Sequence, residues 1–131
     1  MIILKSERDL ELMRPACAVA GRVLEEIAKV LKDYSRKIDK VCRYGGEEFA
    51  IILPQTNKKE AYFIAERLRE SVEKHTFVQE EIQPCKRITV SIGIATFPED
   101  AETKSELIAF ADKLLYKAKA AGRNKTCTLI D

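Results

Sequence analysis

The chain is poor in the residues that build metal clusters and disulfide frameworks. It has no tryptophan, one histidine and four cysteines, and the cysteines are spread singly without a Cys-x-x-Cys pair. Because a structural zinc needs clustered cysteine and histidine ligands, the sequence predicts no such site. The isolated cysteines are predicted to be reduced and buried.

Long hydrophobic runs and a strong net charge are also missing. The apolar runs are too short to span a membrane, and Met1–Leu4 is followed at once by Lys5 and Glu7, unlike a signal peptide. A net charge of +2 gives no electrostatic reason to expect nucleic acid as the main partner. We therefore expect a cytoplasmic protein that binds neither membrane nor nucleic acid.

The length of the chain suits one domain with a single core, because 131 residues are enough for one domain and too few for two of ordinary size. Apolar residues spaced three and four apart predict a long amphipathic helix over Ser6–Tyr34, with a kink at Pro15. Asn57 followed by Glu60 is typical of a helix start, and a third helix is predicted over Thr103–Ala121.

Between these helices the sequence predicts short strands. They cover Met1–Leu4, Lys40–Tyr44, Phe49–Leu53, Ile88–Ile94 and Thr126–Ile130. The order β-α-β-β-α-β-α-β predicts an α+β fold, a ferredoxin-like antiparallel sheet with helices packed on it.

The most informative segment is Gly45-Gly46-Glu47-Glu48, which lies between two of these strands. Paired glycines there predict a tight hairpin turn, since glycine adopts positive φ without steric cost. A turn without side chains lets a ligand approach the backbone, and the next two residues carry negative charge. This arrangement suits a divalent cation held against phosphate oxygens.

Three segments resemble one family. Arg36–Phe49, with its Gly-Gly-Glu-Glu-Phe run, resembles the signature of GGDEF domains, the diguanylate cyclases; Ile88–Ala95 resembles their next strand and Ala111–Asn124 their closing helix. The resemblance extends from about residue 20 to the C-terminus. It implies condensation of two GTP into cyclic di-GMP with Mg²⁺ or Mn²⁺, across a homodimer in which each subunit holds one GTP.

The resemblance also implies roles for the residues of the catalytic site. Glu47 matches the metal-binding carboxylate that helps to activate the attacking 3′-hydroxyl, and Glu48 would support a second metal. Gly45 and Gly46 would let the nucleotide lie against the hairpin. Lys119 and Arg123, four residues apart, would both reach the triphosphate.

A second site is implied five residues before the first glycine. Arg36 and Asp39 match the RxxD motif of the family's product-binding inhibitory site, and Arg67 resembles its secondary arginine. Arginine can donate two hydrogen bonds to phosphate or to a guanine edge, and Asp39 would accept from the guanine.

The amino-terminal part departs from the family. A gapless match places Leu4, Leu12 and Gly21 where the family has a metal-binding aspartate and two guanine ligands. Met1–Arg14 instead resembles the start of methionine aminopeptidases, a similarity that fades by about residue 26 and includes none of their metal ligands. Residues 1–20 are therefore interpreted as a chimera-like replacement of the usual first strand and helix.

Three functions stay open. The first is a GGDEF-type domain that is catalytically impaired but keeps its cyclic di-GMP site. The second is an active diguanylate cyclase, and the third is a structural scaffold or engineered chimeric fold without a ligand. An RNA-binding module is discounted because the basic, aromatic strand motif of such modules is missing.

Overall fold

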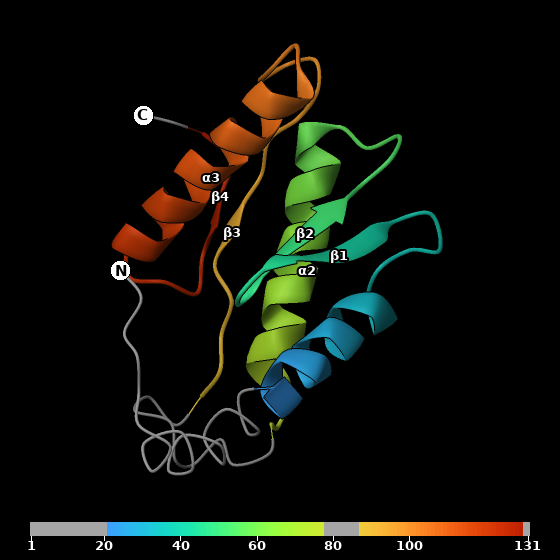
Figure 1. Ribbon diagram of the computed structural model, residues 1–131, viewed down its shortest axis with the longest axis vertical. Helices are drawn as coiled ribbons and strands as arrows, with labels where there is room; N and C mark the ends of the chain where they lie inside the picture. The colour runs from blue at the N-terminus through green and yellow to red at the C-terminus, as the bar shows by residue number, and fades with distance from the viewer. Residues whose placement is uncertain (1–20, 78–86, 130–131) are drawn as a thin grey trace, which may run out of the picture.

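A computed structural model describes residues 21–77 and 87–129. It contains a helix over residues 21–33, two further helices and four strands (Figure 1). In chain order these are β1 Lys40–Gly45, β2 Glu48–Ile52, α2 Lys58–Lys74, β3 Ile92–Gly93, α3 Lys104–Ala120 and β4 Thr126–Cys127. The α+β class is confirmed, while the predicted strand Met1–Leu4 and the start of the long helix lie outside the described residues. Over the ranges described, no helix is long and apolar enough to cross a membrane.

Both labelled helices begin at capping boxes, and the sequence predicts the one at Asn57. The Asn57 side chain accepts from the Glu60 backbone N–H at 2.9 Å, and the Asn57 N–H donates back to the Glu60 carboxylate at 3.0 Å. Thr103 and Glu106 repeat this exchange at the start of α3. Each pair satisfies backbone donors that a helix start otherwise leaves without partners.

The predicted hairpin is formed by β1 and β2. They pair antiparallel, with Gly45 opposite Glu48 and a register shift between Arg43 and Gly45. Gly46 has φ +52°, a conformation that glycine adopts without strain. The turn therefore presents Glu47 at its tip and Glu48 as the first residue of β2.

The rest of the sheet differs from the expectation. β3 pairs with β4 in parallel, and only Ile92–Gly93 and Thr126–Cys127 of the longer predicted strands form ladder pairs. Among the described residues there are thus two separate two-stranded sheets instead of one antiparallel sheet. The alternation of apolar and polar residues predicts that a segment forms a strand. It does not predict which strand pairs with it, because the partner is distant in the sequence.

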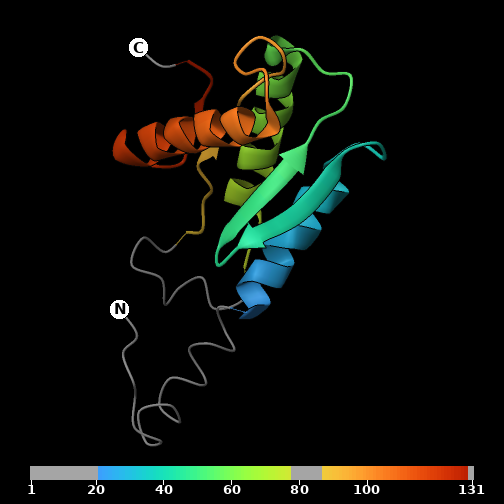
Figure 2. The ribbon, with the colours of Figure 1, turned by 45° about the horizontal axis from the view of Figure 1, so that its top comes forward.

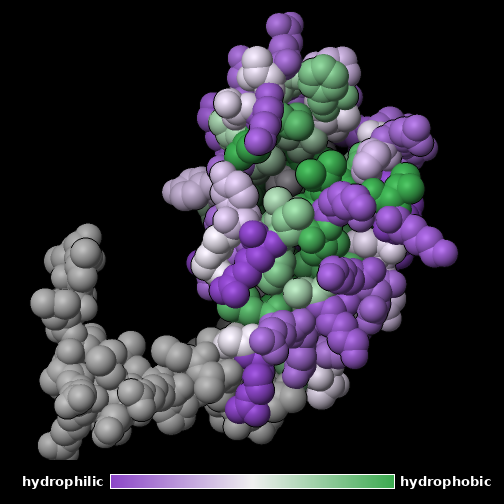
Figure 3. Space-filling view, turned by 45° about the vertical axis from the view of Figure 1, so that its right-hand side comes forward, coloured by the Kyte–Doolittle hydropathy of each residue, from purple (hydrophilic) through white to green (hydrophobic). Residues whose placement is uncertain are grey.

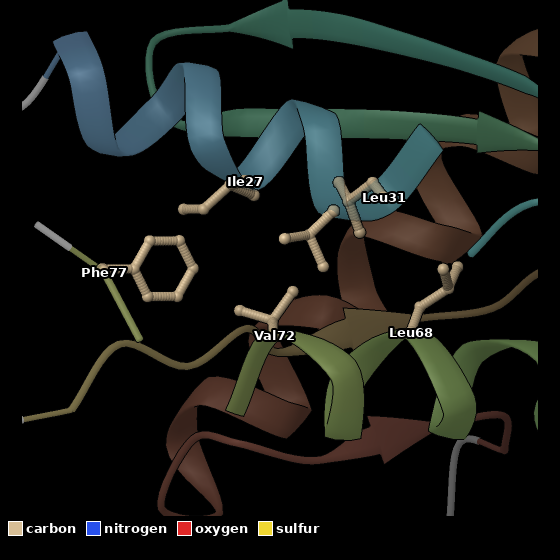
Figure 4. Close-up of a cluster of buried hydrophobic side chains, with 6 residues drawn as sticks. Ile27, Leu31, Leu68, Val72 and Phe77 are labelled. Carbon is tan, nitrogen blue, oxygen red and sulfur yellow. The ribbon is translucent and has the colours of Figure 1, made fainter. Parts of the chain in front are cut away.

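The main core lies between the first helix and α2. Ile27 and Leu31 point toward Leu68 and Val72 of α2, with Phe77 beside them (Figure 4). A second cluster contains Ala61, Ala65 and Ile94, with half-buried side chains packed against it from Leu53 and Ile92. One face of α2 therefore supports the hairpin and the β3 segment together.

Cysteine burial was predicted incorrectly for Cys42 and only partly met by Cys127, while Cys17 and Cys85 lie outside the described residues. Cys42 is exposed on β1, whereas Cys127 on β4 is half-buried, and both are free thiols. The next residue toward the N-terminus, Val41, packs against the core. Because successive side chains of a strand point to opposite faces, Cys42 faces outward.

Gly93 is the point where α3 packs closely against β3. A Cβ placed there would overlap the Ala111 carbonyl oxygen and the Leu115 nitrogen, and would lie 2.9 Å from the Leu114 carbonyl carbon. These are backbone atoms of a helix whose Leu114 side chain is fully buried, so they cannot move aside cheaply. The position therefore requires glycine.

We predict that Gly93→Ala lowers the free energy of unfolding by about 3 kcal/mol, because the added methyl group forces α3 away from β3. The measurement is urea unfolding followed by circular dichroism. Gly21→Ala is the matched control: an added Cβ at this helical position meets nothing within 4 Å. That substitution should stabilise the domain by roughly 0.5–1 kcal/mol. Equal stability of Gly93→Ala and the parent would contradict the close packing.

Candidate functional site

The hairpin tip exposes the four residues that the sequence singles out. Gly45, Gly46 and Glu47 are exposed and Glu48 is half-buried, at the turn that joins the two strands (Figure 2). A Cβ added at either glycine would find no atom within 4 Å. The backbone of the turn is therefore accessible to a ligand, with two carboxylates directly after it.

Arg43 reinforces this tip, a contact that the sequence analysis missed. Its Nε and Nη2 atoms donate to the Gly46 carbonyl oxygen at 2.9 and 2.7 Å. The guanidinium thus holds the turn and adds positive charge beside two carboxylates. Spacing alone does not predict the contact, because it depends on the bulge between Arg43 and Gly45.

The last turn of α3 reaches the hairpin through Lys119. Its Nζ lies 3.6 Å from Oε1 of Glu48, and both side chains are partly exposed. A pair this open contributes little to stability. Its significance is positional, because it brings a flexible ammonium group next to the carboxylates.

Arg123 follows the end of α3, in a run of residues with left-handed backbone conformation. Gly122, Arg123 and Asn124 all have positive φ, at 107°, 62° and 49°. The Arg123 N–H donates to the Ala118 carbonyl at 3.1 Å, but its side chain makes no hydrogen bond or ion pair within the described ranges. The guanidinium is exposed and available. Lys119 and Arg123 therefore lie on the same end of α3.

Arg69 of α2 anchors this loop, and the sequence analysis also missed it. Its Nη1 donates to the Asn124 side chain at 2.8 Å and to Glu73 at 2.9 Å, while Nε donates to Glu66 at 3.0 Å. The hydrogen bonds from Arg69 hold the pKa of the Glu66 carboxyl below its usual range. The i, i+3 and i+4 spacing of this triad was a signal in the sequence; its link to Asn124 was not.

The hairpin offers part of a metal site. Glu47 and Glu48 supply two carboxylates, and residues 21–77 and 87–129 contain no group of three acidic, histidine or cysteine side chains that could hold a metal. Mg²⁺ and Mn²⁺ prefer oxygen ligands, and Mg²⁺ is commonly bound by one or two carboxylates together with phosphates. The donor set therefore fits a cation shared with a phosphate ligand, and does not fit a closed protein site.

The RxxD residues form a tight internal pair. The Arg36 guanidinium donates to Asp39 through Nη2 at 2.7 Å and through Nε at 3.0 and 3.1 Å, and its backbone N–H adds a bond at 2.8 Å. The Asp39 side chain has no exposed surface, whereas that of Arg36 is 36% exposed. The carboxylate is thus fully engaged by its partner, and it would reach a guanine only if this pair opened.

Arg36 also joins a second loop to the pair. Its Nη2 donates to the Thr56 hydroxyl at 2.7 Å and to the Pro54 carbonyl at 3.3 Å. The other terminal nitrogen, Nη1, has no hydrogen bond to the part of the chain that the structure describes. The arginine is therefore held in place on one side and open on the other.

Arg67 lies close to this pair. Its Nη2 donates to the Tyr34 carbonyl at 3.0 Å, at the end of the first helix. Hydrogen bonds from Arg36 are the main cause that lowers the pKa of Asp39, and the charge of Arg67 lowers it further. Beside Arg67 is a surface depression of about 460 Å³, lined also by Tyr34, Lys74 and His75. The three predicted residues of the second site are thus brought together.

The structure describes only one of the three positions at which the expected metal-binding and guanine-binding side chains are missing. Leu4 and Leu12 lie outside the described residues. Gly21 lies in the first helix, half-buried, with open space around its Cα. A glycine has no side chain with which to bind guanine, so this position contributes no such contact.

Comparisons with known proteins agree with the three sequence segments. The family model described as "Diguanylate cyclase, GGDEF domain" matches residues 18–125. Diguanylate cyclase A of Treponema denticola is 40% identical over 108 residues, which cover 82% of this chain and 29% of that protein. The chain therefore spans less than a third of the length of this curated relative. None of these matches supports the resemblance of the first residues to methionine aminopeptidases.

Two solved structures have the same fold. One is the active GGEEF domain of a diguanylate cyclase from Vibrio cholerae, with TM-score 0.77, 26% identity, and coverage of 92% of this chain and 76% of that one. The other is the GGDEF domain of DgcB from Caulobacter crescentus in complex with c-di-GMP, with TM-score 0.69 and 29% identity. That match covers 81% of this chain and 62% of the other.

We predict that Asp39→Asn lowers the free energy of unfolding at pH 7 by about 2 kcal/mol, because a buried charge-assisted pair is lost. The folded-state pKa of Asp39 is lowered, so its contribution is present above the unfolded value of about 3.9 and disappears as the pH falls through the folded value. Urea unfolding at pH 7, 4 and 3 should show the two proteins converging toward acid. A stability difference that grows below pH 4 would contradict the assignment.

Proposed function

Since the chain belongs to the GGDEF family of diguanylate cyclase domains, we propose that it binds cyclic di-GMP while its own cyclase activity is impaired. One observation carries the proposal. Arg36, Asp39 and Arg67 are assembled within the described fold, whereas Leu4, Leu12 and Gly21 stand where the resemblance expects ligands for metal and guanine. Whole-protein activity is part of this proposal, because the chain corresponds to only 29% of the length of the relative above.

The proposed cyclic di-GMP site uses Arg36 as its main contact. Its free Nη1 and its partly exposed guanidinium plane can donate to phosphate or guanine oxygens and stack on a base. Asp39 acts as a positioning residue, because both of its oxygens accept from Arg36. Arg67 supplies a second cation from α2, and c-di-GMP bound to the GGDEF domain of DgcB supports this choice of ligand.

The proposed catalytic site is the hairpin tip. Glu47 and Glu48 would bind Mg²⁺ or Mn²⁺ together with GTP phosphates, and the cation would screen the charge of the reacting phosphate. Gly45 and Gly46 leave space for the nucleotide, and Lys119 and Arg123 would neutralise its triphosphate. Condensing two GTP requires two such sites facing each other, so the proposal includes a homodimer. It also places the domain in the cytoplasm, where GTP is supplied.

The proposed impairment of cyclase activity follows from the metal ligands and guanine contacts that the hairpin and α3 residues do not supply. Two neighbouring carboxylates, one of them 3.6 Å from a lysine, hold a divalent cation weakly without a further ligand. Without polar side chains that recognise the guanine edge, a site also loses much of its nucleotide specificity. The first shortage weakens charge stabilisation during the reaction and the second weakens nucleotide recognition, so both lower the rate.

An active cyclase remains the second candidate, and one observation favours it. The hairpin of this chain has the sequence Gly-Gly-Glu-Glu-Phe, the same GGEEF form named for the active domain from Vibrio cholerae. Glu47, in place of the aspartate of the GGDEF motif, is therefore no obstacle to activity. The two candidates differ in turnover and agree on the fold.

We predict that cyclic di-GMP binds the parent protein in the micromolar range and that Arg36→Ala weakens binding roughly tenfold to a hundredfold, as expected for lost charged hydrogen bonds. Arg67→Ala should weaken binding less. Titration calorimetry measures both. Asp39→Asn is the matched control, because it breaks the same ion pair but keeps the guanidinium, so it should retain more binding than Arg36→Ala.

Two outcomes would count against this binding site. If Arg36→Ala bound cyclic di-GMP as tightly as the parent, the RxxD pair would be only a structural salt bridge. Absence of binding to both cyclic di-GMP and GTP with Mg²⁺ would favour a ligand-free scaffold.

We also predict that the purified protein makes cyclic di-GMP from GTP at least about a thousandfold more slowly than an ordinary enzyme, because a lost metal carboxylate costs several kcal/mol of charge stabilisation. Chromatography of the product, with Mg²⁺ and then Mn²⁺, measures the rate. Glu47→Gln should leave this low rate unchanged. If the parent turns over at ordinary rates and Glu47→Gln abolishes turnover, the active-cyclase candidate is correct.

A further inference from the structure

The loop after α3 has a backbone conformation that needs support from the rest of the fold. Gly122, Arg123 and Asn124 have positive φ, at 107°, 62° and 49°. Glycine adopts this left-handed conformation freely, whereas it costs free energy for residues with a Cβ, although less for asparagine than for most. Contacts with other parts of the chain must therefore keep Arg123 and Asn124 in it.

The end of α3 accounts for only the first of these three residues. The Gly122 N–H donates to the Lys119 carbonyl at 3.3 Å, and the Arg123 N–H donates to the Ala118 carbonyl at 3.1 Å. These two bonds form a Schellman motif, which ends a helix at a glycine with positive φ. The motif explains the conformation of Gly122 and leaves those of Arg123 and Asn124 to other contacts.

Asn124 is held by α2, on the other side of the loop. Its side-chain oxygen accepts from Nη1 of Arg69 at 2.8 Å. Hydrogen bonds from Arg69 and then from Asn124 lower the pKa of the Glu73 carboxyl, so the Asn124 amide both accepts and donates in this network. Arg123 therefore lies between two anchored points, the end of α3 and the side chain of Asn124.

Arg69 is itself held in place by carboxylates. Hydrophilic side chains project outward from the face drawn in Figure 3, whereas the Arg69 side chain is only 13% exposed. Its Nε and Nη2 donate to the two oxygens of Glu66 at 3.0 and 3.1 Å, and Nη1 donates to Glu73 at 2.9 Å. A planar guanidinium can make these bonds together, and a lysine ammonium cannot reproduce them. Because its donors are used within the fold, Arg69 is suited to holding its neighbours and not to binding a ligand.

We propose that Arg69 is a positioning residue for nucleotide binding. By holding Asn124 it fixes the backbone of Arg123, whose exposed guanidinium then stays at the end of α3 from which Lys119 reaches the hairpin. Two cations held at that end can contact one triphosphate, and less freedom of the loop is lost when the ligand binds. This role rests on the proposed catalytic site, in which Lys119 and Arg123 bind the phosphates.

Arg69 and Arg67 serve different sites although they are two residues apart on α2. At 3.6 residues per turn their side chains leave the helix about 160° apart. Arg67 donates to the Tyr34 carbonyl at the end of the first helix, whereas Arg69 donates to Asn124 after α3. Loss of Arg69 should therefore affect the binding of GTP and leave that of cyclic di-GMP as it is.

Titration calorimetry with GTP and Mg²⁺ on the whole chain tests this role. Arg69→Met should weaken GTP binding roughly tenfold in the parent but less than about twofold in the Arg123→Ala variant, because Arg69 acts through Arg123. Lys58→Met is the matched control. Lys58 also lies on α2, is 18% exposed and pairs with two carboxylates, Glu99 and Asp100, which are not part of the loop. Its substitution should leave GTP binding unchanged.

A second variant decides the question if Arg69→Met does not fold. Asn124→Gly removes the side chain that Arg69 holds and keeps a residue that adopts positive φ freely. It should weaken GTP binding in the same way, and only when Arg123 is present.

Three results would overturn the role of Arg69. If Arg123→Ala weakens GTP binding but Asn124→Gly and Arg69→Met bind GTP as the parent does, this role is wrong and the proposed catalytic site stands. If the loss is equal with and without Arg123, Arg69 acts through the stability of the whole fold. If the parent does not bind GTP with Mg²⁺, this role and the proposed catalytic site are both wrong.

Discussion

The placement of both candidate sites depends on the buried carboxylate of Asp39. It is the only buried charged residue in the part of the chain that the structure describes, and Arg36 binds it while also holding Pro54 and Thr56. One ion pair thus fixes the end of the first helix, the start of β1 and the loop after β2. The orientation of the hairpin follows, and with it the position of Glu47 and Glu48. Because the same arginine is the proposed ligand contact, binding must preserve a pair that the fold needs.

Local features were predictable from sequence, because local interactions create them. Asn57 with Glu60 gave the start of α2, and the paired glycines gave the hairpin. The parallel pairing of β3 with β4, the bond from Arg69 to Asn124 and the burial of Asp39 were not predictable in this way. Each joins residues far apart in the chain or depends on how much solvent a neighbour excludes. For the candidate sites, the sequence therefore identified the charged residues themselves. It did not identify the neighbouring side chains, such as Arg69, that hold the surrounding loops in place.

The two candidate sites depend differently on the rest of the chain. The proposed cyclic di-GMP contacts come from the turn after the first helix and from α2, and these two helices pack together in the main core. The hairpin carboxylates instead project from a turn and need further ligands to hold a cation. Under the proposed function, loss of a distant side chain would leave binding in place and remove chemistry. Such a domain would report a nucleotide that it does not make.

The difference between restoring a fold and restoring an activity has a physical cause. A central strand contributes main-chain hydrogen bonds and apolar contacts, which many apolar sequences supply equally well. A metal or a guanine edge requires particular oxygen or nitrogen atoms at set distances, and leucine and glycine side chains have none. An apolar strand can therefore complete a sheet without supplying the atoms that a metal or a guanine needs. Stability and turnover can consequently separate in a domain of this kind, because they depend on different atoms.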